Sequence, residues 1–220
     1  MSAAHRLHEL TAGLGSVADA PDVPITALAL DSRAVTPGAL FIALPGTRTD
    51  GAVHAAEAVK NGAAAVLAGR HLDLAAPCVV APDVRAAAGL VADRFFGEPS
   101  AALEVTAVTG TNGKTSVTHF LAQLTDAGAV IGTEGSGFPG RLEPASRTTP
   151  DVVSLHATLA ALRDQGARAV AMEASSHALD QNRCAGVRLA WGVYTNLGHD
   201  HLDYHPTPEH YAQSKARLFA

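Results

Sequence analysis

The sequence predicts an α/β fold built as two successive units with parallel sheets. Alanine-rich segments of helical periodicity alternate along the 220 residues with short β-branched runs, a pattern typical of α/β proteins. The segment Gly97–Ala101 interrupts this alternation, so we expect one domain over residues 1–101 and a second over 102–220. In the second series, a glycine-rich turn separates a strand-like run from a helix-like one.

The first unit is expected to alternate strands with helices. Its β-branched or apolar runs predict strands at residues 25–30, 40–44, 64–68 and 78–80. A helix is expected over residues 52–61, stopped by Gly62. A second helix, over 83–96, would present one apolar face, made of Val84, Ala87, Leu90, Val91 and Phe95.

The second unit repeats the rhythm. Strands are expected at residues 105–109, 129–131, 169–172 and 189–194. The helix after the glycine-rich turn should bury Val117, Phe120, Leu121 and Leu124. Residues 132–147, rich in glycine and proline, are expected to form a long loop. A helix should start near Thr149 and bury Val152, Leu155, Leu159 and Leu162, and a last helix should run from Pro208 to the end.

Composition narrows the class of protein. The net charge is −5 and no Lys/Arg cluster occurs, which argues against nucleic-acid and anionic-membrane partners. No apolar run reaches the roughly 18–20 residues that span a bilayer, and the N-terminus lacks a signal-peptide core. Cys78 and Cys184 show no metal-binding spacing and suit a reducing compartment. A soluble, cytoplasmic protein is expected.

The glycine-rich turn has the residues of a phosphate-binding loop between a strand and a helix. Its glycines let several backbone N–H groups point at one anion, and the following helix adds its positive end. Lys114 would contact the outer phosphates of ATP, and the Thr115 hydroxyl would bind Mg²⁺. Val108 stands where the general motif has its first glycine, so this is a short variant. The loop comprises Gly110, Thr111, Asn112, Gly113, Lys114 and Thr115.

Two further strands end in polar residues, and ligands bind at the carboxyl ends of parallel strands. Glu173 offers a hard oxygen suited to Mg²⁺, although it could merely cap a helix. The segment after the last strand holds His199, His201 and His205, but their spacing is wrong for a helical zinc pair and a surface loop is the alternative. On sequence alone, Lys215 is most simply a solvated surface residue.

These motifs resemble the Mur ligase family, which builds bacterial peptidoglycan, and within it the MurE-type branch. The likeness covers nearly the whole chain. The first-unit motifs are Leu30–Arg33, Pro37–Phe41 and Asp50–Gly51. The second-unit motifs are the phosphate loop, Thr148–Pro150, Glu173–Leu179, Gln181–Arg183 and Thr195–His205.

The resemblance implies a role for individual positions. The uridine diphosphate would be held by Leu30, Ser32, Thr47, Arg48 and Thr49. The muramoyl-peptide would be contacted by Thr148, Thr149, Ser175, Gln181 and Arg183. Mg²⁺ would be bound by Thr115, Glu173, His201 and Lys215, the last as a carbamate. The catalytic set would be Lys114, Glu173, His201 and Lys215.

The implied activity is an ATP-dependent ligation in cell-wall synthesis. A carboxylate of UDP-N-acetylmuramoyl-L-Ala-D-Glu would become an acyl phosphate, which an amino acid such as meso-diaminopimelate or L-lysine would then attack. The family's C-terminal domain has no counterpart here, so we expect a truncated central domain, an exposed apolar sheet edge and little ligase activity. Two alternatives stay open: the sister ligase that adds D-Ala-D-Ala, and a non-catalytic module that binds a UDP-sugar.

Overall fold

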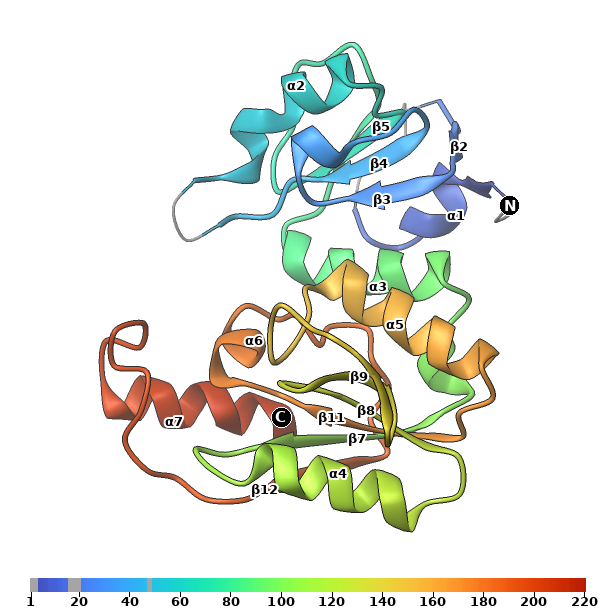
Figure 1. Cartoon of the computed structure of the whole chain (residues 1–220). Helices are drawn as coiled ribbons and strands as arrows, with labels where there is room; N and C mark the ends of the chain where they lie inside the picture. The colour runs from blue at the N-terminus through green and yellow to red at the C-terminus, as the bar shows by residue number, and fades with distance from the viewer. Residues whose placement is uncertain (1–3, 16–20, 47–48) are drawn as a thin grey trace. The chain divides into compact units, whose positions relative to one another are not determined.

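The computed structural model describes residues 4–15, 21–46 and 49–220 of the chain and confirms an α/β architecture with parallel sheets (Figure 1). The chain separates into two compact units, Met1–Phe95 and Phe96–Ala220. No helix in the described part of the chain has both the length and the hydropathy that a membrane crossing requires.

The first unit is organised around a parallel sheet of order β3-β4-β5-β6. A short antiparallel pair, β1-β2, stands apart from it, and the expected strand 25–30 is split between β2 and β3. In the described part of this unit three α-helices accompany the strands, and a 3₁₀ turn, Gly51–His54, replaces the start of the expected helix 52–61. The elements are β1 (His5–Arg6), α1 (Leu7–Thr11), β2 (Pro24–Ile25), β3 (Ala27–Ala29), β4 (Ala39–Ile42), α2 (Ala55–Lys60), β5 (Ala65–Ala68), β6 (Cys78–Val80) and α3 (Val84–Phe95).

The second unit has a six-stranded sheet of order β10-β9-β8-β11-β7-β12, in which β8, β11, β7 and β12 are parallel. Figure 1 shows α4 on one face of this sheet and α5 on the other. The elements are β7 (Glu104–Thr109), α4 (Lys114–Leu124), β8 (Gly128–Gly132), β9 (Gly135–Phe138), β10 (Arg141–Glu143), α5 (Val152–Asp164), β11 (Ala169–Glu173), α6 (Ser176–Asp180), β12 (Trp191–Tyr194) and α7 (Pro208–Ala216).

The loop expected over residues 132–147 is wrong, because this segment contains the antiparallel pair β9–β10 on the edge of the sheet. Its glycines serve close approach between backbones. A Cβ on Gly137 would lie 2.5 Å from the carbonyl oxygen of Arg141, and Gly137 also has a φ of 141°. The glycines that suggested a loop are therefore needed for the close pairing of two strands.

The expected buried face of α4 is also wrong. Phe120 and Leu124 are 63% and 85% exposed, whereas Thr118 and Ala122 are buried. Small residues fit this face because the helix lies close to the sheet: a Cβ on Gly128 of β8 would meet the carbonyl oxygen of Ala122 at 2.3 Å. The Thr118 hydroxyl is satisfied by donating to the Thr115 carbonyl at 2.9 Å.

Helix α5 buries the four residues expected of it, but it begins at Val152 rather than near Thr149. Asp151 is its N-cap and accepts from the N–H of Ser154 at 2.9 Å. On α3, the expected face is buried except for Leu90, which is 40% exposed. The last helix ends at Ala216, and a 3₁₀ turn, Arg217–Phe219, follows it.

The strand β12 lies at one edge of the described six-stranded sheet, so an edge strand is exposed there, as the sequence led us to expect. It pairs with β7 on one side, and Trp191 and Tyr194 are 64% and 44% exposed. The segment Gly97–Ala101, expected to separate two units, is held within the second one. Arg163 donates to the Gly97 carbonyl at 2.9 Å, and the Arg188 N–H donates to Ser100 Oγ at 3.0 Å.

Candidate functional site

The glycine-rich loop leaves the carboxyl end of β7 and enters α4, as the sequence predicts. Gly110 has a φ of 142°, and a Cβ there would lie 1.9 Å from Thr195 Oγ1, so both conformation and space require glycine. Gly113 is the N-cap of α4 in the left-handed region, with a φ of 84°. The turn therefore delivers the N-terminus of α4, and with it Lys114 and Thr115, to the end of the sheet.

The end of β12 supports this loop from the side. The Thr111 N–H donates to the Asn196 carbonyl at 2.9 Å, and the Asn112 N–H donates to Asn196 Oδ1 at 3.1 Å. Thr195 Oγ1 donates to the Asn112 carbonyl at 2.6 Å. The sequence reasoning assigned no role to Thr195 or Asn196 individually, although the rule that sites form at strand ends covers their position.

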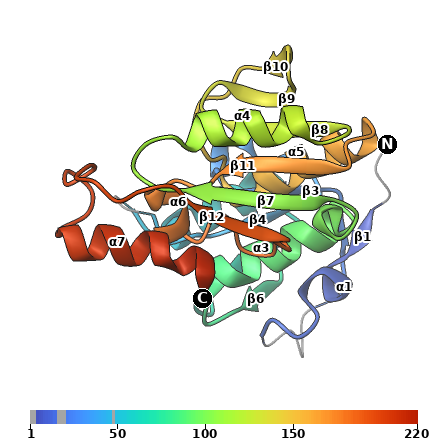
Figure 2. The ribbon, with the colours of Figure 1, turned by 90° about the horizontal axis from the view of Figure 1, so that it is seen from below.

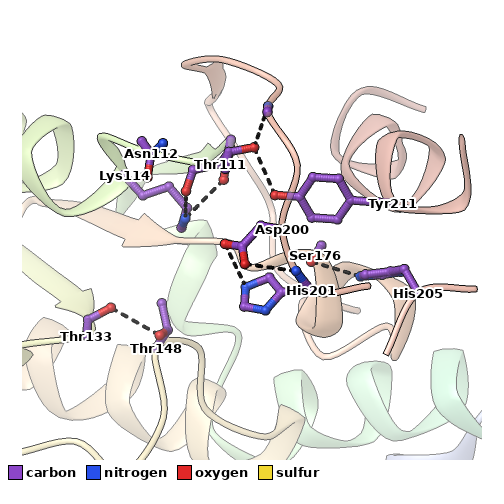
Figure 3. A network of polar contacts seen from close by, with 12 residues as sticks. Thr111, Asn112, Lys114, Thr133, Thr148, Ser176, Asp200, His201, His205 and Tyr211 are labelled. Atoms are coloured by element: carbon purple, nitrogen blue, oxygen red, sulfur yellow. Dashed lines mark hydrogen bonds and ion pairs between the residues drawn. The ribbon is translucent and has the colours of Figure 1, made fainter. Parts of the chain in front are cut away.

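Two lysines converge on one backbone oxygen of the loop. Lys114 Nζ donates to the carbonyls of Gly110 and Thr111, at 3.0 Å in both cases (Figure 3). Lys215 Nζ, from α7, donates to the same Gly110 carbonyl at 2.8 Å. Lys215 is 1% exposed, so it is not the solvated surface residue that its position alone suggested. Burial, and secondarily the charge of Lys114, lowers the pKa of Lys215 to about 8.

Glu173 joins the loop to the ends of β8 and β11. Its side chain is buried, and Oε1 accepts from Thr115 Oγ1 and from the N–H of Thr133, at 2.9 Å in both cases. Gly132 leaves space for it, because a Cβ there would lie 2.3 Å from Oε1. Glu173 is thus no simple helix cap. Thr133, whose hydroxyl also lies 3.4 Å from Oε2, was missed by the sequence reasoning, although it directly follows β8.

The five residues that the resemblance assigns to the muramoyl-peptide form two hydrogen-bonded groups. Thr149 Oγ1 lies 3.3 Å from Ser175 Oγ, and the Thr149 carbonyl accepts from Arg183 Nη1 at 3.0 Å. Arg183 also donates to Gln181 Oε1 at 2.7 Å. The Thr133 hydroxyl donates to Thr148 Oγ1 at 3.1 Å (Figure 3), and Thr133 in turn contacts Glu173. Burial, followed by the charge of Arg147, lowers the pKa of Arg183.

The histidine segment lies beside these groups but does not assemble a metal cage. His201 is in the left-handed region with a φ of 55°, and its Nε2 lies 3.5 Å from Asp200 Oδ2. Its ring is 4.8 Å from that of His177. Across the described residues, no group of three or more His, Cys, Asp or Glu side chains is arranged to hold a metal. His199 acquires no role in this arrangement.

His205 serves packing and hydrogen bonding instead. It is fully buried, with Nε2 2.9 Å from Ser176 Oγ and Nδ1 2.9 Å from His210 Nδ1. Burial, and then the neighbouring His177 and His210, lowers the pKa of His205, which favours the neutral ring. A neutral imidazole can donate from one nitrogen and accept at the other, which this pair of contacts allows.

The first unit has a separate cavity of about 460 Å³. Leu30, Ser32 and Thr49 line it, as expected for one binding site. Thr47 and Arg48, assigned to the same site, lie outside the described residues. The sequence reasoning missed Glu57, which also lines the cavity and accepts from Ser32 Oγ at 2.6 Å.

Comparisons with known families cover both units. The Mur ligase middle domain matches residues 108–220, and the catalytic domain of the Mur ligase family matches residues 24–93. Both matches are to one family of ligases and together include the loop, the strand ends and the first-unit cavity.

Individual relatives agree with these matches. The UDP-N-acetylmuramoyl-L-alanyl-D-glutamate–2,6-diaminopimelate ligases of Alkalilimnicola ehrlichii and Pseudomonas aeruginosa are 47% and 50% identical over 97% and 90% of this chain. The chain spans 46% and 43% of their lengths. A solved ligase of the same description has a TM-score of 0.83 and 37% identity over 98% of this chain and 45% of its own. MurF from Acinetobacter baumannii, at 24% identity, shares the fold, with a TM-score of 0.65 over 100% of this chain and 47% of its own.

Proposed function

The chain belongs to the Mur ligase family, and from this premise we propose that it supplies the nucleotide- and substrate-binding half of a MurE-type ligase. The reaction would join 2,6-diaminopimelate to UDP-N-acetylmuramoyl-L-alanyl-D-glutamate, as the names of its relatives state for them. The chain spans less than half of those relatives, so the proposal concerns the part of the reaction that its own residues support.

The observation that carries the proposal is the convergence on the phosphate loop. Lys114, Thr115 and Lys215 all lie within hydrogen-bond distance of the loop or of Glu173, which ends β11. Two buried or half-buried cationic groups at one carbonyl repel each other and destabilise the fold. A bound anion would offset this repulsion. A triphosphate is such an anion, and the N-terminus of α4 adds its positive end.

Lys114 would stabilise the charge that builds on the γ-phosphoryl group as it is transferred. The D-glutamate side-chain carboxylate attacks the γ-phosphorus, the bond to the bridging oxygen breaks, and ADP leaves. The amino group of the incoming amino acid then attacks the acyl carbon. A C–N bond forms, inorganic phosphate departs, and the amine proton passes to solvent.

The residues around Glu173 fit a magnesium ion. Glu173 provides a buried carboxylate, and the hydroxyl of Thr115 is already hydrogen-bonded to it, so two hard oxygen donors face each other. A divalent ion there would neutralise phosphate charge. His201 would be a further ligand by resemblance, but its present partners are Asp200 and His177.

The Lys215 side chain suits carbamylation for a physical reason. A buried amine with a pKa of about 8 is uncharged far more often than an ordinary lysine, and only the uncharged amine reacts with carbon dioxide. The amine nitrogen bonds to the carbon of CO₂ and loses a proton, and the product is an anionic carbamate. This anion would relieve the repulsion from Lys114 and would add an oxygen ligand for the metal.

The hydrogen-bonded pairs around Thr149 and Arg183 are proposed to hold the muramoyl-peptide. Arg183 is suited to a carboxylate because its planar guanidinium can make two parallel hydrogen bonds. We assign residues 102–220 to ATP and this peptide, and residues 1–101 to the UDP part through the cavity at Ser32. The cytoplasm is the proposed compartment, since Cys78 and Cys184 are both free thiols.

Isothermal titration with Mg-ATP and with UDP-N-acetylmuramoyl-L-Ala-D-Glu tests the proposal. Both ligands should bind the wild-type chain. Lys114→Ala should weaken Mg-ATP binding by about tenfold or more, because a charge-assisted contact to phosphate is lost. Lys60→Ala, at an exposed position on α2, is the matched control and should leave the affinity unchanged.

The same titrations separate the alternatives. Binding of the UDP-sugar without Mg-ATP would favour a non-catalytic module. Binding of Mg-ATP together with the tripeptide form of the sugar nucleotide, but not the dipeptide form, would favour the D-Ala-D-Ala-adding ligase. Binding of neither ligand would contradict the ligase assignment for this chain.

A further inference from the structure

Tyr211 stands between the phosphate loop and Lys215. It lies on α7 one helical turn before Lys215, so the two side chains share a face of the helix. Its side chain is 2% exposed. Figure 3 shows its hydroxyl group in contact with Thr111, yet neither the sequence reasoning nor the proposed chemistry uses Tyr211.

The hydroxyl group of Tyr211 is fixed to the loop. Tyr211 Oη lies 3.0 Å from Thr111 Oγ1. Thr111 Oγ1 also accepts a hydrogen bond from the N–H of Gly198, at 2.8 Å. The Thr111 side chain is therefore hydrogen-bonded both to α7 and to the segment after β12. One hydroxyl pair thus ties three separate chain segments together.

The ring of Tyr211 covers the amine of Lys215. Lys215 Nζ lies 4.5 Å from the ring centroid, within the range of a cation–π contact. The amine has the Gly110 carbonyl as its hydrogen-bond partner at 2.8 Å. The two residues of α7 thus contact two successive residues of the loop, Gly110 and Thr111.

A lysine side chain has four rotatable bonds and places its amine well only when its surroundings fix it. Here the backbone oxygen of Gly110 fixes the end of the chain, and the Tyr211 ring excludes water and alternative rotamers from one side. A rigid aromatic residue does this at small entropic cost.

We propose that Tyr211 is a positioning residue: its hydroxyl locks the phosphate loop to α7 through Thr111, and its ring holds the Lys215 amine at the loop. This inference rests on the proposed function of the same site. It assigns to Tyr211 no contact with the reacting atoms. It predicts separable consequences for the hydroxyl and for the ring.

Two substitutions separate them. Tyr211→Phe removes the hydroxyl and keeps the ring, whereas Tyr211→Leu removes both. Tyr194→Phe, at a half-exposed tyrosine on β12, is the matched control. Far-ultraviolet circular dichroism and thermal unfolding establish that each variant is folded.

The ring is tested by acetylation of lysines with an activated ester, read by mass spectrometry with Lys60 as the internal reference. In the wild type, in Tyr211→Phe and in Tyr194→Phe, Lys215 should be modified far more slowly than Lys60. In Tyr211→Leu the rate at Lys215 should rise by about tenfold or more, because the amine becomes accessible and mobile. An unchanged rate in folded Tyr211→Leu would overturn the role of the ring.

The hydroxyl is tested by a double-mutant cycle of Tyr211→Phe and Thr111→Val on the affinity for Mg-ATP. Tyr211→Phe, which loses one hydrogen bond, should weaken binding by about five- to tenfold, and Thr111→Val, which also loses the bond from Gly198, should weaken it at least as much. The double variant should bind Mg-ATP as tightly as the single variant with the lower affinity, because both changes break the same contact. Independent, multiplying effects would overturn the coupling. If the wild type bound no Mg-ATP, the proposed function would fail, while acetylation would still decide the position of Lys215.

Discussion

The ammonium groups of Lys114 and Lys215 both donate to the carbonyl oxygen of Gly110, at 3.0 and 2.8 Å. One lysine begins the helix that follows the phosphate loop, and the other comes from the last helix, about a hundred residues later (Figure 2). Figure 2 shows α6 and α7 at the same end of the sheet. Two like charges at one oxygen repel each other and lower the stability of the fold, but they attract an anion. A mutation that removes one of them can therefore raise stability while weakening anion binding.

The first prediction concerns the stability cost of Lys215. Lys215→Met should raise the free energy of unfolding at pH 7 by about 1–2 kcal/mol, because a buried charge is replaced by an apolar chain of similar length. The Gly110 carbonyl keeps Lys114 as a donor. Urea unfolding measures the change, with Lys60→Met as an exposed control that should be near neutral. A loss of stability at pH 7 would contradict the burial of an unfavourable charge.

The pH dependence of this effect has a definite sign. The pKa of Lys215 falls from 10.5 to about 8 on folding, so between these values the unfolded chain binds more protons. The contribution of Lys215 is therefore unfavourable below pH 8, improves as the pH rises, and is relieved above about 10.5. The gain in the free energy of unfolding from Lys215→Met should therefore be smaller at pH 9.5 than at pH 7, and unfolding curves at the two pH values measure it.

The second prediction concerns carbamylation of the same side chain. In ¹³C-bicarbonate buffer the wild-type chain should show a carbamate carbon signal by NMR that grows as the pH rises from 7 to above 8, since the uncharged amine reacts. Lys215→Met should abolish the signal, and Lys60→Met should keep it. A signal that survives in Lys215→Met would assign the modification elsewhere.

The third prediction isolates the steric requirement at Gly110. Gly110→Ala places a Cβ 1.9 Å from Thr195 Oγ1, whereas Gly140→Ala, also at a positive φ of 83°, meets nothing within 4 Å. Gly140→Ala should cost about 1 kcal/mol for its backbone conformation. Gly110→Ala should cost about 2 kcal/mol more or displace the loop and abolish Mg-ATP binding. Equal effects of the two changes on stability and binding would show that Thr195 imposes no such constraint.

The fourth prediction concerns the metal. Glu173→Gln keeps the size of the side chain but removes its charge, so the Thr115 hydroxyl retains an acceptor while Mg²⁺ loses its carboxylate. ATP should bind the wild type more tightly with Mg²⁺ than with EDTA, and this difference should fall by about tenfold in Glu173→Gln. Titrations with and without Mg²⁺ measure it. A variant that kept the full difference would remove Glu173 from the metal site.

The fifth prediction concerns the edge of the sheet at β12. Its unpaired backbone and the exposed Trp191 should promote self-association of the 220-residue chain as concentration rises. Trp191→Lys should reduce it in sedimentation velocity, because a charge on an edge strand opposes pairing. Val53→Lys adds the same charge at an exposed apolar residue of the first unit and should not. A wild type that stays monomeric at every concentration would remove the edge as an interaction surface.

The sequence by itself determined the local features of this protein. The α/β alternation, the glycine-rich loop and the buried face of α5 depend on residues close together in the chain, and they were predicted correctly. Periodicity failed where the partner surface decides. It could not show that α4 approaches β8 so closely that Thr118 and Ala122 are buried instead of Phe120 and Leu124. Nor could it tell a glycine of a loop from a glycine of the pair β9–β10.

Only the tertiary structure decided which distant groups meet. By its position in the chain alone Lys215 reads as a surface lysine, although the family resemblance assigned it to the metal site; its burial at Gly110 depends on how α7 packs beside the end of the sheet. The same holds for the bond between Tyr211 and Thr111, which are 100 residues apart. Such contacts depend on the closure of long loops and on packing between elements, and neither leaves a signal in the local order of residues.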